Sequence, residues 1–478
     1  MEKERESDTG GFNNRLFKIK LLTGMILGKG LILLTRLLGR GGTTLPGRAV
    51  LKLDPAIPSA LAGKLQDGSI LITGTNGKTT TAALISGVMK ESGLRCIRNQ
   101  SGSNMSWGVT SALVEASSLT GKPAGECAIM EVDEGAFPGV VQSIKPKGIV
   151  VTNVFRDQLD RYGEVDWIRD AIKRGLEYQP EEGFQVLNGD DPSLTGLVAG
   201  KNRWTYGLEL ELPEDRFQNT GRDIKTCPNC NARLDYSRIY YAHLGHFHCP
   251  SCNFKRETPD VKLTRKKTAA GGGEVLEIEL PDEKITMKSS LAGTYNLYNI
   301  LAAVTCAVAM SIPSDVIIRS IEEAVPSFGR MEQFNWSGKS ITMALIKNPV
   351  GANEVLRTIL NQSDKISLMV AINDKIADGR DVSWLWDVDF EYFVAKKEGI
   401  SIILVSGLRA WDMAVRFKYA GISPDSIVVE ENTEKALNKI LKLTSEGENI
   451  IILPTYTAML EIRKHLNRMG LGKPYWES

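Results

Sequence analysis

The stretch that decides the fold is Ser69 to Thr81, SILITGTNGKTTT, which continues as AALISGVMKES. An aliphatic run meets two glycines and then a helix-like segment, which predicts a strand, a phosphate-binding loop and a helix. In such a loop, backbone N–H groups surround phosphate oxygens, Lys78 reaches the β- and γ-phosphates, and the hydroxyl of Thr79 binds Mg²⁺. We therefore predict that ATP is held by Thr73, Gly74, Thr75, Asn76, Gly77, Lys78, Thr79 and Thr80.

Length and charge set the bounds for the rest of the chain. Its 478 residues are 42% hydrophobic and 24% charged, which predicts a globular protein with more than one core. With 58 basic against 57 acidic residues the net charge is +1, so no global field favours binding to nucleic acid. An anionic substrate must be bound by local groups.

The cysteine pattern indicates a reducing compartment and a metal site. Four of the seven cysteines form two Cys-x-x-Cys pairs, and no cleavable signal peptide precedes them, so we expect a cytoplasmic protein. The pairs flank residues 231–248, the spacing of a zinc ribbon, and a closed four-thiolate site predicts structural zinc. Three histidines between the pairs are alternative ligands, and the remaining three cysteines are expected to be buried free thiols. The predicted zinc ligands are Cys227, Cys230, Cys249 and Cys252, the histidines are His243, His246 and His248, and the expected free thiols are Cys96, Cys127 and Cys306.

The N-terminal segment is apolar but interrupted by charge. Lysines and an arginine divide residues 16–38, which leaves no uncharged run of about 18 residues that spans a bilayer. Two interpretations stay open: a helix that packs on the next domain or on a partner, and a basic amphipathic helix that lies on an anionic membrane surface. The following stretch, GRGGTTLPG, predicts a loop.

Further motifs follow the phosphate loop in a set order. CAIMEVDEG reads as a buried strand that ends in Glu131 and Glu134, which are candidate Mg²⁺ ligands. IVVTNVFRDQLDRYG ends a second strand in a cluster with Asp157 and Asp160. SLAGTYNLYNILAA places Asn296 and Asn299 on one helix face, and FGRME contains Arg330.

Together these motifs resemble the Mur ligase superfamily, which also shares its phosphate loop with folylpolyglutamate synthases. The resemblance implies that Asn296 and Asn299 contact adenine and that Arg330 touches phosphate. It differs at Gln158, where the family carries a histidine that helps the metal. Lys173 lies about where the family carries a carbamylated lysine, and an ordinary surface lysine is an equal alternative.

The implied fold class is α/β. We expect an N-terminal segment over residues 1–58 and a Mur ligase central domain over 59–328, with a mostly parallel sheet covered by helices on both faces. A four-cysteine insertion at about 222–258 interrupts this domain. Residues 329–478, which contain ITMALI, ISLMVAIN, ISIILVSG and NIIILPT, are expected to form a Rossmann-like domain with a parallel sheet.

The C-terminal part resembles MurT-type subunits of lipid II isoglutaminyl synthase. INDKIADGRDVSWLWDVDFE matches their signatures, and LIKNPVGAN keeps Asn348 while Ala344 and Lys347 replace the aspartate and histidine of other Mur ligases. The resemblance implies an ATP-dependent ligase that activates the α-carboxylate of D-glutamate in lipid II as an acyl phosphate for amidation. Lys78 and Glu131 are the expected catalytic residues, with Mg²⁺ near Thr79 and Glu131.

A glutamine-hydrolysing partner is implied as well. The chain shows no Cys/His pairing of its own, so ammonia is expected from a GatD-type glutamine amidotransferase in a heterodimer at the inner face of the plasma membrane. Asp374 is expected to complete the partner's Cys/His pair, with Asp378 and Asp381 as alternatives from the same stretch and a turn cap as the structural alternative.

Two other functions stay open. One is a ligase that adds an amino acid, which the zinc ribbon and the NDxxADGRD stretch disfavour. The other is a non-enzymatic nucleotide-gated module that binds through the ribbon. Because only Arg233 and Arg238 are fixed cations between the outer cysteines, the ribbon does not predict nucleic-acid binding. We also expect Cys227→Ser to loosen the insertion while the phosphate loop stays formed.

Overall fold

The computed structural model describes most of the chain. The described ranges are 2–38, 42–99, 102–156, 165–197, 202–211, 224–269, 273–325, 331–362, 365–395 and 399–471. Arg330, Asp157, Gln158 and Asp160 lie outside them.

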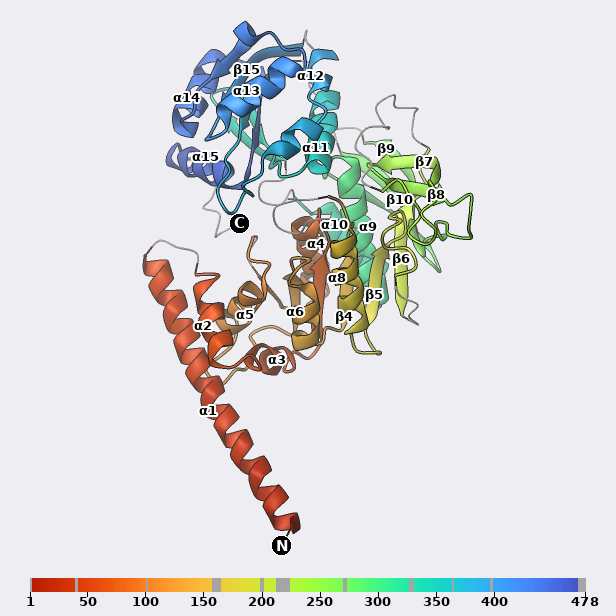
Figure 1. The fold of residues 1–478 in the computed structure, drawn as a ribbon, viewed down its shortest axis with the longest axis vertical. Coiled ribbons are helices and arrows are strands. Elements are labelled where there is room, and N and C mark those ends of the chain that lie inside the picture. The colour runs from red at the N-terminus through yellow and green to blue at the C-terminus, as the bar shows by residue number, and fades with distance from the viewer. Residues whose placement is uncertain are drawn as a thin grey trace.

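In the described residues, a nine-stranded sheet forms the central part of the molecule, in the order β11-β10-β9-β6-β5-β4-β1-β3-β2 (Figure 1). The strands from β2 to β9 in this order run parallel, and β9, β10 and β11 form an antiparallel edge. The strands are β1 (Gly68–Thr73), β2 (Cys96–Arg98), β3 (Cys127–Glu131), β4 (Gly148–Val151), β5 (Phe184–Asn188), β6 (Arg203–Leu208), β9 (Val261–Thr268), β10 (Glu274–Glu279) and β11 (Lys284–Ser289).

Helices cover both faces of this sheet, because its strands are apolar on both sides. On one face α4 (Lys78–Glu91), α9 (Thr294–Ala309) and α10 (Ser314–Glu322) build one core. On the other face α5 (Ser106–Glu115), α6 (Phe137–Ile144) and α8 (Val165–Glu177) build a second core.

The N-terminal segment is helical and packs along one side only. It forms α1 (Glu2–Leu37), α2 (Leu45–Leu53) and α3 (Ile57–Ala62). Leu21, Met25 and Ile32 of α1 join the second core, whereas Ile19, Ile26 and other large apolar residues of the opposite face are exposed. Figure 1 shows α1 at the edge of the molecule, with its N-terminal part extending away from the body. Among the described residues, no helix combines the length and apolar character needed to cross a bilayer.

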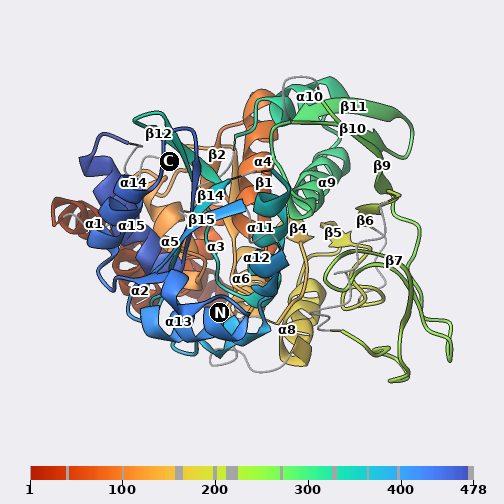
Figure 2. The ribbon, with the colours of Figure 1, turned by 90° about the horizontal axis from the view of Figure 1, so that it is seen from above.

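The four-cysteine insertion lies between β6 and β9. Its centre is an antiparallel hairpin of β7 (Asp235–Tyr241) and β8 (Leu244–His248). In Figure 2 the segment that contains β7 extends from the side of the central sheet that lies opposite α1.

A second sheet of six strands forms the C-terminal part of the described chain, in the order β12-β13-β17-β14-β15-β16. Only the β12–β13 pair is antiparallel. The strands are β12 (Glu332–Trp336), β13 (Lys339–Met343), β14 (Ile366–Ala371), β15 (Ile400–Ser406), β16 (Ile427–Val429) and β17 (Asn449–Pro454). One face of this sheet carries α11 (Pro349–Gln362), α12 (Glu391–Ala395), α13 (Ala410–Tyr419) and the short η1 (Ser383–Asp387). The other face carries α14 (Thr433–Leu443) and α15 (Tyr456–Arg468). The short η3 (Pro424–Ser426) precedes β16.

The expected α/β fold class is confirmed, but the expectation for two cysteines is wrong. Cys96 and Cys127 form a disulfide, because β2 and β3 are neighbours and place these residues opposite each other, with Cα atoms 4.7 Å apart. Cys306 is a buried free thiol, as expected, and burial raises its pKa.

Candidate functional site

The phosphate loop joins β1 to the N-terminus of α4. Gly74 and Gly77 have φ angles of 120° and 90°, which side chains other than glycine rarely adopt. A Cβ at Gly77 would also lie 2.2 Å from Oδ1 of Asn299. The loop therefore presents its backbone N–H groups at the start of a 14-residue helix, where the helix dipole favours an anion.

The end of β4 holds the loop in place. The backbone N–H of Asn76 donates to Oδ1 of Asn153 at 2.9 Å, and the hydroxyl of Thr152 donates to the carbonyl of Asn76 at 2.7 Å. Thr75 donates its N–H to the carbonyl of Asn153 at 2.9 Å. These bonds fix the cradle before any ligand arrives.

Charged groups at the end of β3 face the start of α4. The Nζ of Lys78 lies 3.2 Å from Oε2 of Glu134, and these side chains are only 10% and 4% exposed. Lys78 also donates to the carbonyl of Gly74. The hydroxyl of Thr79 donates to Oε2 of Glu131 at 2.9 Å. A hydroxyl and a carboxylate at this separation are the oxygen donors that Mg²⁺ takes, whereas Glu134 serves the lysine.

A pocket opens between the loop and the helix α9. Asn299 accepts from Thr81 at 3.3 Å and donates to Asn296 at 3.1 Å, so the predicted asparagine pair does lie beside the phosphate loop. The pocket is lined by Asn76, Gly77, Thr80, Asn153, Tyr241, Tyr295, Tyr298, Asn299, Met331, Ala344, Leu345, Gly351, Glu354 and Val355.

Residues of the C-terminal part complete this site. Nζ of Lys347 donates to the carbonyl of Thr75 at 3.2 Å, and Nδ2 of Asn348 donates to Oδ1 of Asn76 at 3.1 Å. Ala344, which stands in place of the aspartate of other Mur ligases, lines the pocket. In the sequence, Lys347 stood out only as the replacement of a histidine, and its contact with the phosphate loop was not predicted.

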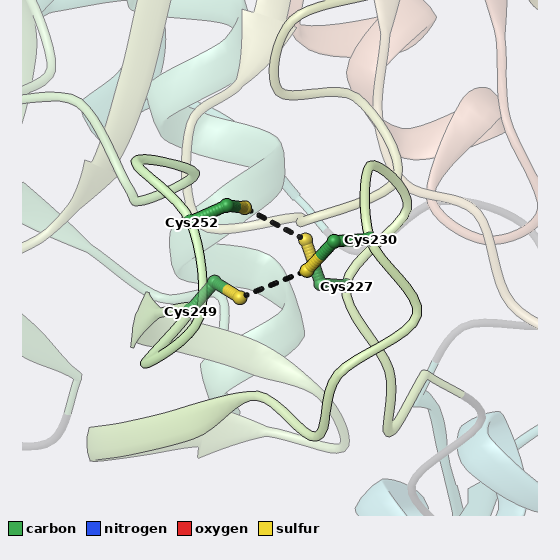
Figure 3. Close-up of side chains that lie close together, drawn as sticks. All are labelled: Cys227, Cys230, Cys249 and Cys252. Atoms are coloured by element: carbon green, nitrogen blue, oxygen red, sulfur yellow. Dashed lines mark hydrogen bonds between the residues drawn. The ribbon is translucent and has the colours of Figure 1, made fainter.

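The four cysteines of the insertion converge on one point (Figure 3). Their Sγ atoms all lie within 4.8 Å of one another, with Cys227 and Cys252 at 3.6 Å and Cys230 and Cys249 at 3.4 Å. Zn–S bonds of about 2.3 Å in a tetrahedron separate sulfur atoms by about 3.8 Å, so these thiols fit zinc. The pKa of Cys249 is lowered overall. Desolvation by burial raises this pKa, but the hydrogen bond from the N–H of Ser251 and the neighbouring thiols lower it by more.

The aspartates after β14 have different surroundings. Asp378 accepts from the N–H and the hydroxyl of Thr457 at the start of α15, each at 2.6 Å, and Asp381 accepts from the N–H of Ser383 at 2.8 Å, so both carboxylates have structural partners. Asp374 is 23% exposed and pairs with Arg409 at 2.8 Å. The structural alternative therefore applies to Asp378 and Asp381, the two alternatives to Asp374.

Sequence profiles and relatives identify the family. The profile of the Mur ligase middle domain matches residues 72–227, and that of the MurT ligase C-terminal domain matches residues 345–459. The lipid II isoglutaminyl synthase (glutamine-hydrolyzing) subunit MurT of Staphylococcus aureus (strain COL) is 35% identical over 440 residues, which cover 92% of this chain and 96% of that protein. The chain belongs to the MurT family. The MurT subunit of Streptococcus pneumoniae (strain ATCC BAA-255 / R6) is 34% identical over 449 residues, 94% of this chain and 97% of that one.

Solved structures share the fold of this MurT-family chain. A pseudomurein peptide ligase type C from Methanothermus fervidus has a TM-score of 0.65 and 20% identity, and covers 88% of this chain and 84% of its own. MurF ligase from Thermotoga maritima in complex with ADP has a TM-score of 0.62 and 15% identity, with 89% and 85% covered. These structures show the shared fold, and the match of the Mur ligase middle domain to residues 72–227 confirms the resemblance that the motifs indicated.

Lys173, the candidate carbamylated lysine, has a different setting from the residues at the phosphate loop. Lys173 is exposed on α8, which agrees with the alternative of an ordinary surface lysine.

Proposed function

We propose that this chain is the ATP-dependent ligase subunit of lipid II isoglutaminyl synthase in peptidoglycan synthesis. It activates the α-carboxylate of D-glutamate in the lipid II stem peptide so that ammonia converts it to D-isoglutamine. The observation that carries this proposal is the buried Lys78–Glu134 and Thr79–Glu131 arrangement at the phosphate loop of a MurT-family chain. We assign residues 59–328 and 329–478 to the two domains that meet at this loop.

The roles of the site residues follow from their positions. Residues 73–80 bind the phosphates of ATP, with Lys78 against the transferred phosphate. Asn296 and Asn299 contact the base, and Arg330 serves phosphate as the family resemblance implies. Thr79 and Glu131 hold Mg²⁺, which neutralises phosphate charge when bound. The four cysteines hold structural zinc.

The reaction has two balanced steps. A carboxylate oxygen of D-glutamate forms a bond to the γ-phosphorus, and the bond from that phosphorus to the bridging oxygen breaks, which releases ADP. Ammonia then attacks the acyl carbon, a C–N bond forms, and phosphate leaves while a proton is lost to water. Lys78 and the loop N–H groups neutralise the charge that moves to the bridging oxygen, so positioning and electrostatics supply the catalysis.

A glutamine amidotransferase of the GatD type supplies the ammonia. Asp374 is the best candidate to complete that partner's Cys/His pair, because Asp378 is held by Thr457 of α15 and Asp381 by the adjacent turn, whereas Asp374 is partly exposed and pairs with the side chain of Arg409. Ile376 follows Asp374 by two residues, Leu408 and Trp411 flank its partner Arg409 in the sequence, and these three side chains are 77%, 62% and 62% exposed. We call these three side chains the apolar patch; a partner that covers it would gain burial and reach Asp374.

We also propose that the N-terminal helix binds the inner face of the plasma membrane, where a lipid-linked substrate is found. Residues 15–38 contain five cations and no acidic residue. Ile19, Leu22, Ile26 and Leu33 are exposed along one face of α1, and the exposed Arg15 and Lys18 precede these residues in the same helix. A helix with an apolar face and basic residues binds an anionic lipid surface.

Vesicle binding tests this membrane contact. The full chain should sediment with phosphatidylglycerol-containing vesicles, and Leu22→Asp with Ile26→Asp should abolish sedimentation while Leu443→Asp, on exposed α14, leaves it unchanged. If the double variant instead changes a monomer–dimer equilibrium and not sedimentation, the face binds a second copy and the membrane role is wrong.

Product analysis tests the function itself. Lipid II incubated with ATP, Mg²⁺, glutamine, this chain and a GatD-type subunit should change in mass by the difference between a carboxylic acid and its amide. Omission of the partner should leave lipid II unchanged. A gain of the mass of an amino-acid residue would instead establish a ligase that adds an amino acid.

A further inference from the structure

The ribbon insertion is divided between two cores. Its cysteine end forms a small core of its own, with Cys227, Cys249, Phe247 and Phe254. The far end of the hairpin belongs to the central core, which includes Tyr240, Tyr241 and Leu244. The tip of the hairpin therefore packs with the domain that carries the nucleotide site, and the expectation that the phosphate loop stays formed in Cys227→Ser stays a prediction.

Tyr241 reaches the nucleotide pocket from this tip. Its side chain is among those that line the pocket, together with Tyr298 and Asn299 from α9. It is 2% exposed, and its ring centroid lies 5.1 Å from that of Phe155 and 6.5 Å from that of Tyr298. An aromatic group of the ribbon thus forms part of the wall of the pocket beside the phosphate loop, where a base joined to loop-bound phosphates would lie.

The next turn of the hairpin is anchored beneath the phosphate loop. His243 is fully buried, with Nε2 3.4 Å from Oδ1 of Asp191 and its ring 4.9 Å from that of Phe155. Asp191 accepts from the N–H of Val154 at 2.8 Å. Phe155 in turn donates its N–H to the hydroxyl of Thr75 at 3.0 Å. A continuous set of contacts joins the ribbon to the loop.

The metal site lies at the other end of the same hairpin. Cys249 directly follows β8, and Cys230 precedes the start of β7 by a short turn. Drawing the four thiols together therefore fixes the open end of the hairpin, and the β7–β8 pairing carries that restraint to Tyr241.

We propose that Tyr241 is a base-contacting residue of the ATP site and that the zinc ribbon sets the affinity for ATP by holding this side chain in place. The inference rests on the proposed function only in that the pocket binds ATP. It gives the ribbon a role in nucleotide binding rather than in partner or nucleic-acid recognition.

Calorimetric titration of the full chain with ATP, without lipid II or partner, tests Tyr241. Loss of an aromatic group that stacks on a base should raise the Kd of Tyr241→Ala about tenfold. Tyr241→Phe keeps the ring and should stay within about twofold, as should the control Ser237→Ala, whose side chain is exposed on the same hairpin. Tripolyphosphate, which has no base, should bind wild type and Tyr241→Ala equally.

Removal of zinc tests the second part of the proposal, that the ribbon holds Tyr241 in place. Cys252→Ser, or treatment with a zinc chelator, should raise the Kd for ATP by about the same factor as Tyr241→Ala. Combined with Tyr241→Ala, either treatment should raise the Kd little further, because both changes remove the same interaction. Additive losses, or complete loss of binding in both backgrounds, would contradict the route through Tyr241. Equal ATP affinity of wild type and Tyr241→Ala would overturn the inference alone, whereas a wild type that binds no ATP would overturn the proposed function.

Discussion

The carboxyl ends of β3 and β14 both carry acidic residues, but they are built differently. At the end of β3, Glu131 and Glu134 are buried and contact Thr79 and Lys78 of the same domain. At the end of β14, Asp374 is partly exposed and pairs with Arg409 close in sequence to the apolar patch, while the next aspartate, Asp378, accepts from Thr457 of α15.

This difference indicates which step of the reaction each part of the chain serves. A buried set of opposite charges is preorganised and does chemistry without another protein. A partly exposed ion pair close to exposed apolar side chains has a surface that a second protein can cover. We therefore attribute ATP-dependent activation to the first strand end and partner-dependent ammonia supply to the second, and four predictions test this division.

Lys78→Ala has the largest expected effect. It removes the cation at the transferred phosphate and leaves Glu134 buried without its ion pair, so the amidation rate should fall on the order of a thousandfold with either glutamine or ammonium as the nitrogen source. Mass spectrometry of lipid II measures the rate. Lys90→Ala, at the exposed end of α4, is the control and should behave as wild type. Retained activity in Lys78→Ala would remove the phosphate loop from the mechanism.

Asp374→Asn should separate the two halves of the reaction. Without the carboxylate, the glutamine-dependent rate in the complex should fall on the order of a hundredfold, because a general base loses its orienting group. The ammonium-dependent rate should not change, and Asp425→Asn on exposed η3 should alter neither rate. If both nitrogen sources fail equally, Asp374 acts in activation and the comparison between the strand ends breaks down.

Ile376→Asp should weaken the partner interface. A charge in the apolar patch must be desolvated on docking, so the Kd for the glutamine amidotransferase should rise at least about tenfold in a calorimetric titration. ATP binding by the isolated chain should be unaffected. The exposed Leu443 of α14 supplies the control Leu443→Asp. An unchanged Kd would mean that the partner docks elsewhere.

Lys173→Ala has the smallest expected effect. Since its side chain is exposed on α8, the amidation rate should stay within about twofold of wild type. A large loss that added bicarbonate or a short carboxylate restores would instead indicate a carbamylated lysine at the metal site.

Local patterns were sufficient to predict the phosphate loop, the four-cysteine cluster and the main apolar strands of both sheets, because each is specified by nearby residues. Contacts between distant segments were not predictable. The Cys96–Cys127 pair depends on β2 lying beside β3, and the contact of Lys347 with Thr75 depends on how the two sheets meet. Tyr241 carries no motif, since only the fold brings the ribbon hairpin to the nucleotide pocket.

Aspartate-rich stretches show the same limit. The sequence after β14 predicts a cluster of carboxylates but not which of them cap turns. Asp381 accepts from Ser383, and Asp387 pairs with Arg156 of the central part of the chain. Only the hydrogen bonds distinguish these residues from Asp374.

The division of labour is tested most directly by the nitrogen source that the chain uses alone. Lipid II, ATP and Mg²⁺ are incubated with the purified chain and either ammonium chloride or glutamine, and the product is weighed by mass spectrometry. We expect amidated lipid II with ammonium, and no amidated lipid II with glutamine until the partner is added. Amidation from glutamine by the chain alone, or ATP consumption with no amide at any ammonium concentration, would contradict it.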